Sequence, residues 1–203
     1  MTATALRRNR RLGIPRFYAK LGLTIGLMAA LHGTSHAGGS GYEPTHPARI
    51  AAAPANARSF FVEFRARKEL GGFGHSYLLL GSIDSSGVAR VTVIAGFMPK
   101  GPDDDRWSRL GLPVNGIVGV TRSDLIRQPV ARIRLTVNEA TFHRLVAQVQ
   151  SLRKTWGTYE VLLRNCNSFV GEVASAGGLR APLLSTQFPV MYIEELRRLN
   201  ASR

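Results

Sequence analysis

The most informative segment of this 203-residue chain reads Tyr159-Glu-Val-Leu-Leu-Arg-Asn-Cys-Asn-Ser-Phe-Val-Gly-Glu-Val-Ala174. It contains Cys166, the only cysteine of the chain, where an extended stretch is expected to lead directly into a helix. Asn165 is a favourable N-cap residue, so Cys166 falls in the first turn. A helix N-terminus carries about half a positive charge and unpaired N–H groups, which lower the pKa of a thiol there. Because the thiolate is the nucleophilic form, Cys166 is a candidate catalytic residue.

The rest of the folded part is predicted from hydrophobic periodicity and turn residues. Strands are expected at residues 59–66, 75–80, 88–97, 114–120 and 132–137, and helices at 138–154, 165–176 and from 189 onward. Residues 98–113 contain Pro-Lys-Gly-Pro and the triplet Asp103-Asp-Asp105, and they are expected to form a surface loop. This order predicts an α+β domain, with a small antiparallel β-sheet packed against the cysteine helix and its neighbour.

The first 37 residues have the pattern of an export signal. They contain six basic and no acidic residues, and their apolar run, residues 21–31, is about half the ~20 residues that span a bilayer. Small residues at Ser35 and Ala37 suit a cleavage site before Gly38. An uncleaved membrane anchor is the alternative. Residues 38–58, rich in glycine, proline and alanine, are expected to be a flexible linker, and residues 59–203 a single domain.

The charge of the chain bears on its partners. The chain has 27 basic and 13 acidic residues, and removal of the leader leaves 21 basic and 13 acidic residues, a net charge of +8. This excess favours anionic lipid or cell-wall polymer, although an ordinary solvated basic surface also explains it. No basic run with interleaved aromatic residues follows the leader, so no nucleic-acid partner is expected. No transmembrane segment is expected after signal removal, and a single cysteine excludes an internal disulfide.

His75 is the candidate partner of Cys166. It begins a predicted strand directly after the glycine-rich segment Gly71-Gly-Phe-Gly74. If the two residues pack together, the imidazole can take the thiol proton, and the N–H groups of Cys166 and its neighbours can form an oxyanion hole. The simpler alternative is that both residues are structural, because a free cysteine is often a small buried hydrophobe. One cysteine and one well-placed histidine do not make a zinc site, and no phosphate-binding loop occurs, so no metal or cofactor is expected.

The order of these residues resembles the circularly permuted papain-like superfamily, in which the histidine strand precedes the cysteine helix. The segment Leu162-Leu-Arg-Asn-Cys-Asn-Ser-Phe169, followed by Glu172-Val173, is similar to the cysteine motif of desumoylating isopeptidases of the PPPDE group. Phe73-Gly-His-Ser-Tyr-Leu78 fits the histidine strand of that superfamily. NlpC-type cell-wall amidases and lecithin–retinol-acyltransferase-like (LRAT-like) proteins are related members.

The resemblance implies Cys166 as nucleophile and His75 as base, in a permuted papain-like domain. Several members orient the histidine with a polar residue on the following strand, where this chain offers only Thr92. The alternatives are a Cys-His dyad, or a backbone carbonyl or a residue elsewhere in the chain that orients the ring. The expected function is that of an exported, periplasmic or secreted thiol hydrolase or acyltransferase that cleaves an amide, isopeptide or acyl bond. Cell-wall peptide is a candidate substrate because of the expected location. The alternative is a non-catalytic, envelope-associated binding domain that keeps the fold.

Overall fold

The structure, a computed structural model, describes residues 43–51, 57–69 and 73–202. The predicted export signal, residues 1–37, lies outside the described residues, as does part of the predicted linker, residues 38–58. Within that linker, the structure contains two short strands, β1 (His46–Pro47) and β2 (Arg49–Ile50). They pair with strands of the main sheet, so part of the segment expected to be a linker belongs to the sheet.

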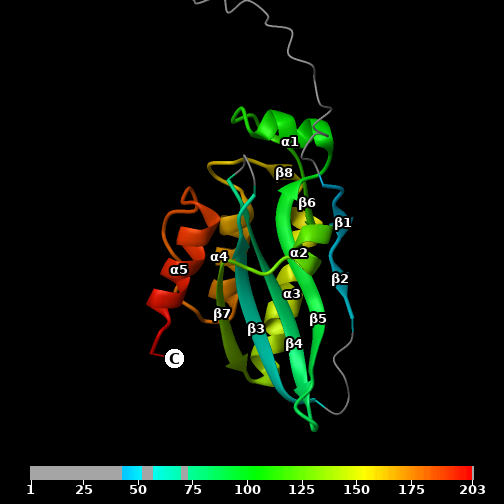
Figure 1. Cartoon of the computed structure of the whole chain (residues 1–203), viewed down its shortest axis with the longest axis vertical. Helices are drawn as coiled ribbons and strands as arrows, with labels where there is room; N and C mark the ends of the chain where they lie inside the picture. The colour runs from blue at the N-terminus through cyan, green and yellow to red at the C-terminus, as the bar shows by residue number, and fades with distance from the viewer. Residues whose placement is uncertain (1–42, 52–56, 70–72, 203) are drawn as a thin grey trace, which may run out of the picture. The chain divides into compact units, whose positions relative to one another are not determined.

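The sheet is antiparallel at every pairing (Figure 1). Its long strands are β3 (Ala57–Arg67), β4 (His75–Asp84), β5 (Ala89–Pro99), β6 (Val114–Val120) and β7 (Ala131–Val137). They follow the order β1-β6-β5-β4-β3-β7, with β2 pairing with β5 and the short β8 (Thr158–Tyr159) pairing with β6. The strand that begins with His75 is therefore central, and its position is fixed by β3 on one side and β5 on the other.

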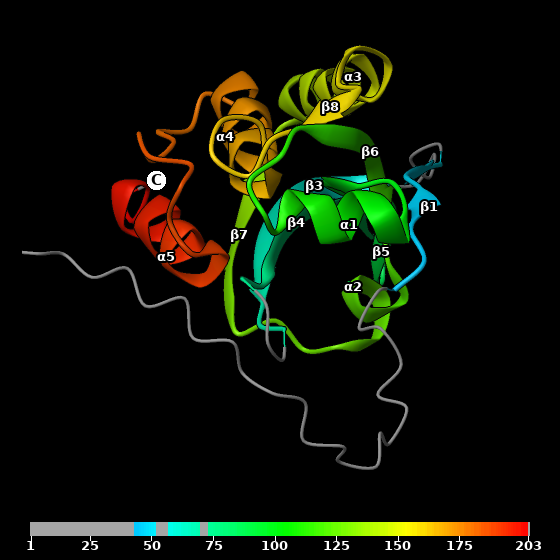
Figure 2. The same ribbon diagram turned by 90° about the horizontal axis from the view of Figure 1, so that it is seen from above.

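Three helices, α3 (Glu139–Thr155), α4 (Cys166–Ala176) and α5 (Pro189–Leu199), cover one face of the sheet (Figure 2). Alternate residues of each strand point to this face, as the period-2 pattern of β3 predicts. The core between sheet and helices includes Phe60, Val62, Phe64, Leu78, Leu80, Ala95, Leu145, Phe169, Val173 and Ile193. This packing fixes α4, and therefore Cys166, against β4.

The opposite face of the sheet is also largely buried, although its side chains include charged groups. Glu63 is 1% exposed and accepts hydrogen bonds from Arg65 (2.5 Å) and Arg134. Arg67, 3% exposed, pairs with Asp124 of the short helix α2 (Arg122–Ile126). A buried charge is tolerated when a hydrogen-bonded partner accompanies it, which is the case for both groups.

The α+β prediction is confirmed, and α3 and α4 begin at the expected caps, Asn138 and Asn165. The predicted loop at residues 98–113 is wrong in part, because residues Pro102–Ser108 form helix α1. Proline is favourable at the first position of a helix, and carboxylates in the first turn interact well with the helix dipole. The three aspartates that suggested a loop tip therefore stabilise a helix N-terminus.

Candidate active site

Cys166 is the first residue of α4, and the helix start is organised around Asn165. The Asn165 side chain accepts hydrogen bonds from the backbone N–H groups of Asn167 (2.9 Å) and Ser168 (3.0 Å). The Ser168 hydroxyl in turn accepts from the N–H of Asn165 (2.7 Å), which completes a capping box. The cap fixes the direction of the first turn and so the position of the Cys166 side chain, which is 6% exposed.

The structure brings Cys166 and His75 together, although 91 residues separate them in the sequence. Burial raises the pKa of the Cys166 thiol. The adjacent His75 imidazole lowers it by more, through hydrogen bonding and its positive charge. The nearby Ser76 acts in the same direction, and the resulting pKa of Cys166 lies below its usual value. The Cys166 thiol therefore loses its proton more easily than an ordinary thiol does.

The pKa of His75 moves in the opposite direction. Burial lowers it, but the charge of Asp124 and the interactions with Cys166 outweigh this effect, so the pKa of His75 is raised. A lowered thiol pKa beside a raised imidazole pKa shifts the pair toward the thiolate–imidazolium form.

Asp124, which the sequence analysis did not identify, lies on the other side of the imidazole. His75 Nε2 is buried and has no hydrogen-bond partner among the described residues, and it lies 4.0 Å from Asp124 Oδ2. Asp124 is itself held rigidly, because Arg67 Nε donates to its Oδ1 (2.7 Å) and the N–H of Thr121 donates to its Oδ2 (2.8 Å).

A signal for Asp124 is present in the sequence. Thr121-Arg-Ser-Asp124 has the spacing of a capping box, and in the structure Thr121 caps α2 with Asp124 in the third position. The pattern could have predicted the helix. That this aspartate reaches the histidine could not be read from the pattern, because it depends on how α2 packs on the sheet.

Gly96 of β5 makes room for the imidazole. A Cβ at this position would lie 2.4 Å from His75 Nε2, closer than real Cβ contacts allow. The part of the following strand that faces the histidine therefore carries no side chain. Thr92, the sequence-based candidate for orienting His75, lies farther along β5, opposite the Leu80–Gly81 step of β4. At ~3.3 Å per residue, this step lies about 15 Å or more along β4 from His75. Thr92 is therefore too far away to orient the imidazole.

The two asparagines beside Cys166 also anchor the segment that precedes α5. The Asn165 amide donates to the carbonyl of Ser185 (3.0 Å), and the Asn167 amide donates to the carbonyls of Ser185 (3.0 Å) and Gln187 (2.7 Å). Asn167 Oδ1 accepts from the Ser76 hydroxyl (2.8 Å), which connects the same residue to the histidine strand. These bonds hold residues 185–187 beside the nucleophile.

A cavity of about 250 Å³ opens next to Cys166 and His75. Its wall includes the aromatic residues Phe73, Tyr159 and Phe188 together with Leu162. Burial, and then the nearby negative charges, raise the pKa of Tyr159 well above its usual value, so this phenol stays protonated. The cavity thus brings aromatic and charged side chains together with the Cys166 sulfur.

The oxyanion hole expected at the helix start is smaller than predicted. The Asn165 side chain occupies the N–H groups of Asn167 and Ser168, so they are not available to a substrate. Among the described residues, no hydrogen bond is recorded for the N–H of Cys166, and this group remains for a carbonyl oxygen. The same part of the chain contains no cluster of three His, Cys, Asp or Glu side chains that could hold a metal ion.

Comparisons with protein-family models, with curated proteins and with solved structures find no match to this chain. The helices in the described ranges include none with both the length and the apolar character of a membrane span. The function of the chain is therefore inferred from the geometry of the site.

Proposed function

We propose that this protein is a thiol hydrolase or acyltransferase with a permuted papain-like domain, in which Cys166 is the nucleophile and His75 the general acid and base. One observation carries the proposal. The thiol at the start of α4 and the imidazole at the start of β4 interact at a cavity, and their pKa values are shifted in opposite directions. Such shifts are typical of catalytic pairs.

The reaction follows from the two charge states. The Cys166 thiolate attacks a carbonyl carbon, so that an S–C bond forms and negative charge moves to the carbonyl oxygen. The His75 imidazolium gives its proton to the leaving amine or alcohol as the C–N or C–O bond breaks. The neutral imidazole then takes a proton from water, the hydroxide oxygen bonds to the carbonyl carbon, and the S–C bond breaks. An acceptor alcohol or amine in place of water gives acyl transfer.

The surrounding residues support the same chemistry. The charge of Asp124, 4.0 Å from Nε2, stabilises the imidazolium, as the carboxylate of a catalytic triad does. The N–H of Cys166 can donate to the developing oxyanion, and the protonated Tyr159 phenol on the cavity wall is a second available donor. The Asn165 cap keeps the helix start in place without using the N–H of Cys166.

The permuted arrangement is supported by the chain order. The histidine strand β4 precedes the cysteine helix α4, and α4 packs against β4 and β5. Export, a periplasmic or secreted location and cell-wall peptide as substrate remain predictions from the leader sequence. Within this proposal the bond cleaved is an amide, isopeptide or acyl bond, since the thiolate attacks any of these carbonyls by the same path.

The test is the rate of alkylation of Cys166 by iodoacetamide as a function of pH. We expect an activated thiolate to react well below pH ~8.5, and His75→Ala to reduce the rate near neutral pH by about tenfold or more. His143→Ala is the matched control, because His143 is exposed on α3 and pairs with Glu139 (3.6 Å). It should leave the rate unchanged.

Turnover is tested with a chromogenic acyl ester, for which Cys166→Ala should abolish the burst of released alcohol. Two results would contradict the proposal and favour the alternative of a binding domain without turnover. One is alkylation of Cys166 only after unfolding. The other is an identical alkylation profile in the His75→Ala variant.

A further inference from the structure

The cavity beside Cys166 has the opposite sign of charge from the chain as a whole. After the leader, the chain has 21 basic and 13 acidic residues, a net charge of +8. The lining of the cavity instead contains three carboxylates and two guanidinium groups, those of Glu43, Glu69, Asp105, Arg67 and Arg109. Asp124, which is bonded to Arg67, adds a fourth carboxylate beside the lining. Four carboxylates and two guanidinium groups leave an excess of two negative charges.

The ion pairs show where this excess lies. Arg109 Nε donates to Asp105 Oδ2 (3.0 Å), so these two charges cancel. Arg67 is shared between two carboxylates, because its Nε donates to Asp124 Oδ1 (2.7 Å) and its Nη1 to Glu69 Oε1 (2.6 Å). One guanidinium cancels only one of these charges. The other negative charge therefore remains at Glu69 and Asp124.

The second uncancelled charge is that of Glu43. Its carboxylate accepts a hydrogen bond from the backbone N–H of Ser123, which is a neutral group. Among the residues that the structure describes, no cationic side chain forms an ion pair with Glu43. The pairing of β1 with β6 holds the segment that follows Glu43 on the sheet, and Glu43 lines the cavity together with Thr45.

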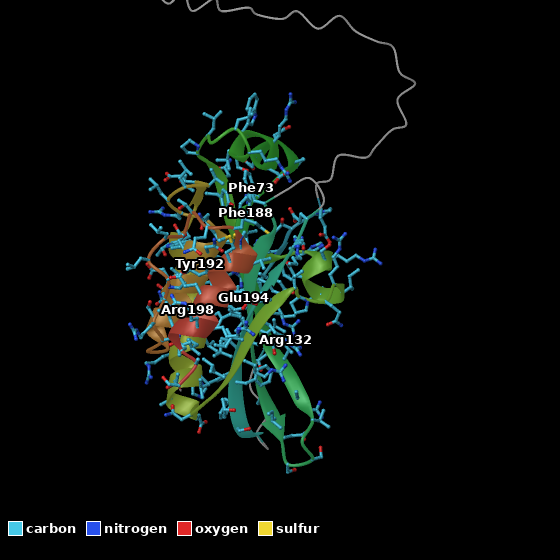
Figure 3. All side chains as sticks on the ribbon, turned by 60° about the vertical axis from the view of Figure 1, so that its left-hand side comes forward. Phe73, Arg132, Phe188, Tyr192, Glu194 and Arg198 are labelled. Atoms are coloured by element: carbon cyan, nitrogen blue, oxygen red, sulfur yellow. The ribbon has the colours of Figure 1, made fainter. Side chains whose placement is uncertain are left out.

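Aromatic rings line the same space. Phe73 stacks on Phe188 with ring centroids 6.1 Å apart, and the two side chains lie together near the start of α5 (Figure 3). Both rings are more than half exposed, so a ligand can reach them, and Tyr159 is a third aromatic residue of the lining. The face of an aromatic ring carries negative potential and attracts ammonium and guanidinium groups. Rings and carboxylates thus favour the same kind of ligand.

The cavity is a candidate ligand site on grounds that do not involve these carboxylates. Cys166 and His75 both line it, and their pKa values are shifted in opposite directions. His75 is only 6% exposed, and its Nε2 has no hydrogen-bond partner among the described residues. A buried polar atom without a partner is unusual and is typical of functional sites.

We propose that the cavity takes a substrate with a positively charged group, an ammonium or a guanidinium, close to the carbonyl that Cys166 attacks. The substrate class, which rests on the function proposed above, is then an amide, isopeptide or acyl compound with a cationic side chain or a free amino terminus. Glu43 and Glu69 determine this specificity, since each has a carboxylate oxygen with no hydrogen bond recorded among the described residues. An anionic substrate is less favoured, because Arg67 and Arg109 are already bonded to carboxylates.

The experiment compares two thiol reagents of similar size and opposite charge on the full chain. They are 2-(trimethylammonium)ethyl methanethiosulfonate and 2-sulfonatoethyl methanethiosulfonate, and Cys166 is the only thiol that they can modify. Each rate is divided by the rate of the same reagent with 2-mercaptoethanol, which removes differences in intrinsic reactivity. At low salt, we expect the corrected ratio of cation to anion to be at least about tenfold. The ratio should fall in about 1 M salt because the charges are screened.

The variants Glu43→Gln and Glu69→Gln identify the source of this preference. Glutamine keeps a hydrogen-bond acceptor and removes the charge, so each variant should lower the corrected ratio by about threefold or more. Glu139→Gln is the matched control, because Glu139 follows the end of β7 that pairs with Phe60, at the far end of the sheet from His75. It should leave the ratio unchanged.

A corrected ratio near one, or a ratio that neither Glu43→Gln nor Glu69→Gln lowers, would overturn the cationic substrate class. A ratio below one would overturn it in favour of an anionic substrate bound by the arginines. Failure of the catalytic pair gives a different result, in which His75→Ala retains both the cation preference and the parent rate with iodoacetamide. That outcome would keep the charge preference of the cavity and reject the proposed hydrolase. A folded protein in which Cys166 reacts with none of these reagents would reject both proposals.

Discussion

Asp124 has two roles at once, since it completes the capping box of α2 and lies beside the buried imidazole of His75. Asparagine at this position keeps an acceptor for the cap but removes the negative charge. We expect Asp124→Asn to lower the pKa of His75 and, through the weakened imidazolium, to raise the pKa of Cys166. The pH at which alkylation is half-maximal should therefore move upward by about one unit.

The control for this variant is Asp84→Asn, which removes an aspartate that pairs with Arg90 (3.4 Å) at the opposite end of β4 from His75. It should leave the pH profile in place. If Asp124→Asn folds normally and its profile is also unchanged, Asp124 does not act on the imidazole and is only a helix cap.

Gly96 gives a steric test of the same site. A methyl group there would lie 2.4 Å from His75 Nε2, so Gly96→Ala must displace the ring or the strand. We expect the alkylation rate near neutral pH to fall toward that of His75→Ala. Gly157→Ala is the control, because no atom lies within 4 Å of its added Cβ. Equal alkylation rates in Gly96→Ala and Gly157→Ala would mean that the observed position of the imidazole is not needed for thiol activation.

At the level of elements, the start of α4 and the segment before α5 depend on the same side chain. Asn165→Ala removes the helix cap and the bonds to Val161 and Ser185, so we expect a loss of stability of about 1–2 kcal/mol and a change in thiol reactivity. Asn138→Ala is matched, because Asn138 caps α3 through the N–H of Thr141 (2.8 Å) and lies outside the site. It should reduce the unfolding free energy in urea to a similar extent and leave the alkylation rate constant.

The elements that the sequence predicts well are those with local signals. The alternation in β3 and the caps of α3 and α4 are visible in neighbouring residues, and these parts of the prediction are confirmed. Helix α1 was missed because aspartates occur both in turns and in first helical turns, and the pattern alone does not distinguish them.

The same distinction between local signals and tertiary packing applies to the residues of the candidate site. Cys166 could be singled out from its unique position before a helix, and His75 from its place at the start of a strand. The approach of Asp124 to His75 joins residues 49 positions apart, and the clearance at Gly96 depends on strand register. Neither the approach of Asp124 nor the clearance at Gly96 can be predicted from neighbouring residues, because both depend on tertiary packing.

For the whole molecule, the buried charges predict how stability depends on pH. Burial raises the pKa of Asp124, but the charges of His75 and Arg67 outweigh it, and the pKa is lowered. A carboxylate with a lowered pKa stabilises the fold above its unfolded value of about 3.9, and this contribution is lost as pH falls through the folded value. We expect the thermal midpoint to fall between about pH 5 and about pH 3, and to fall less in Asp124→Asn.

Calorimetry or circular dichroism at several pH values measures this dependence. An equal fall in both proteins would show that other carboxylates control acid unfolding. The comparison also separates stability from reactivity, since iodoacetamide reports on the thiol alone.

The site is assembled from residues 67, 75, 124 and 166, and it is anchored by carbonyls at 185 and 187. The ribosome adds residues 185 and 187 after the other residues of the site, because synthesis proceeds from the N-terminus. Before the chain folds, the sulfur has no imidazole beside it and keeps the ordinary thiol pKa of about 8.5. Under the proposed function, the thiol therefore gains its lowered pKa only when folding brings His75 to Cys166.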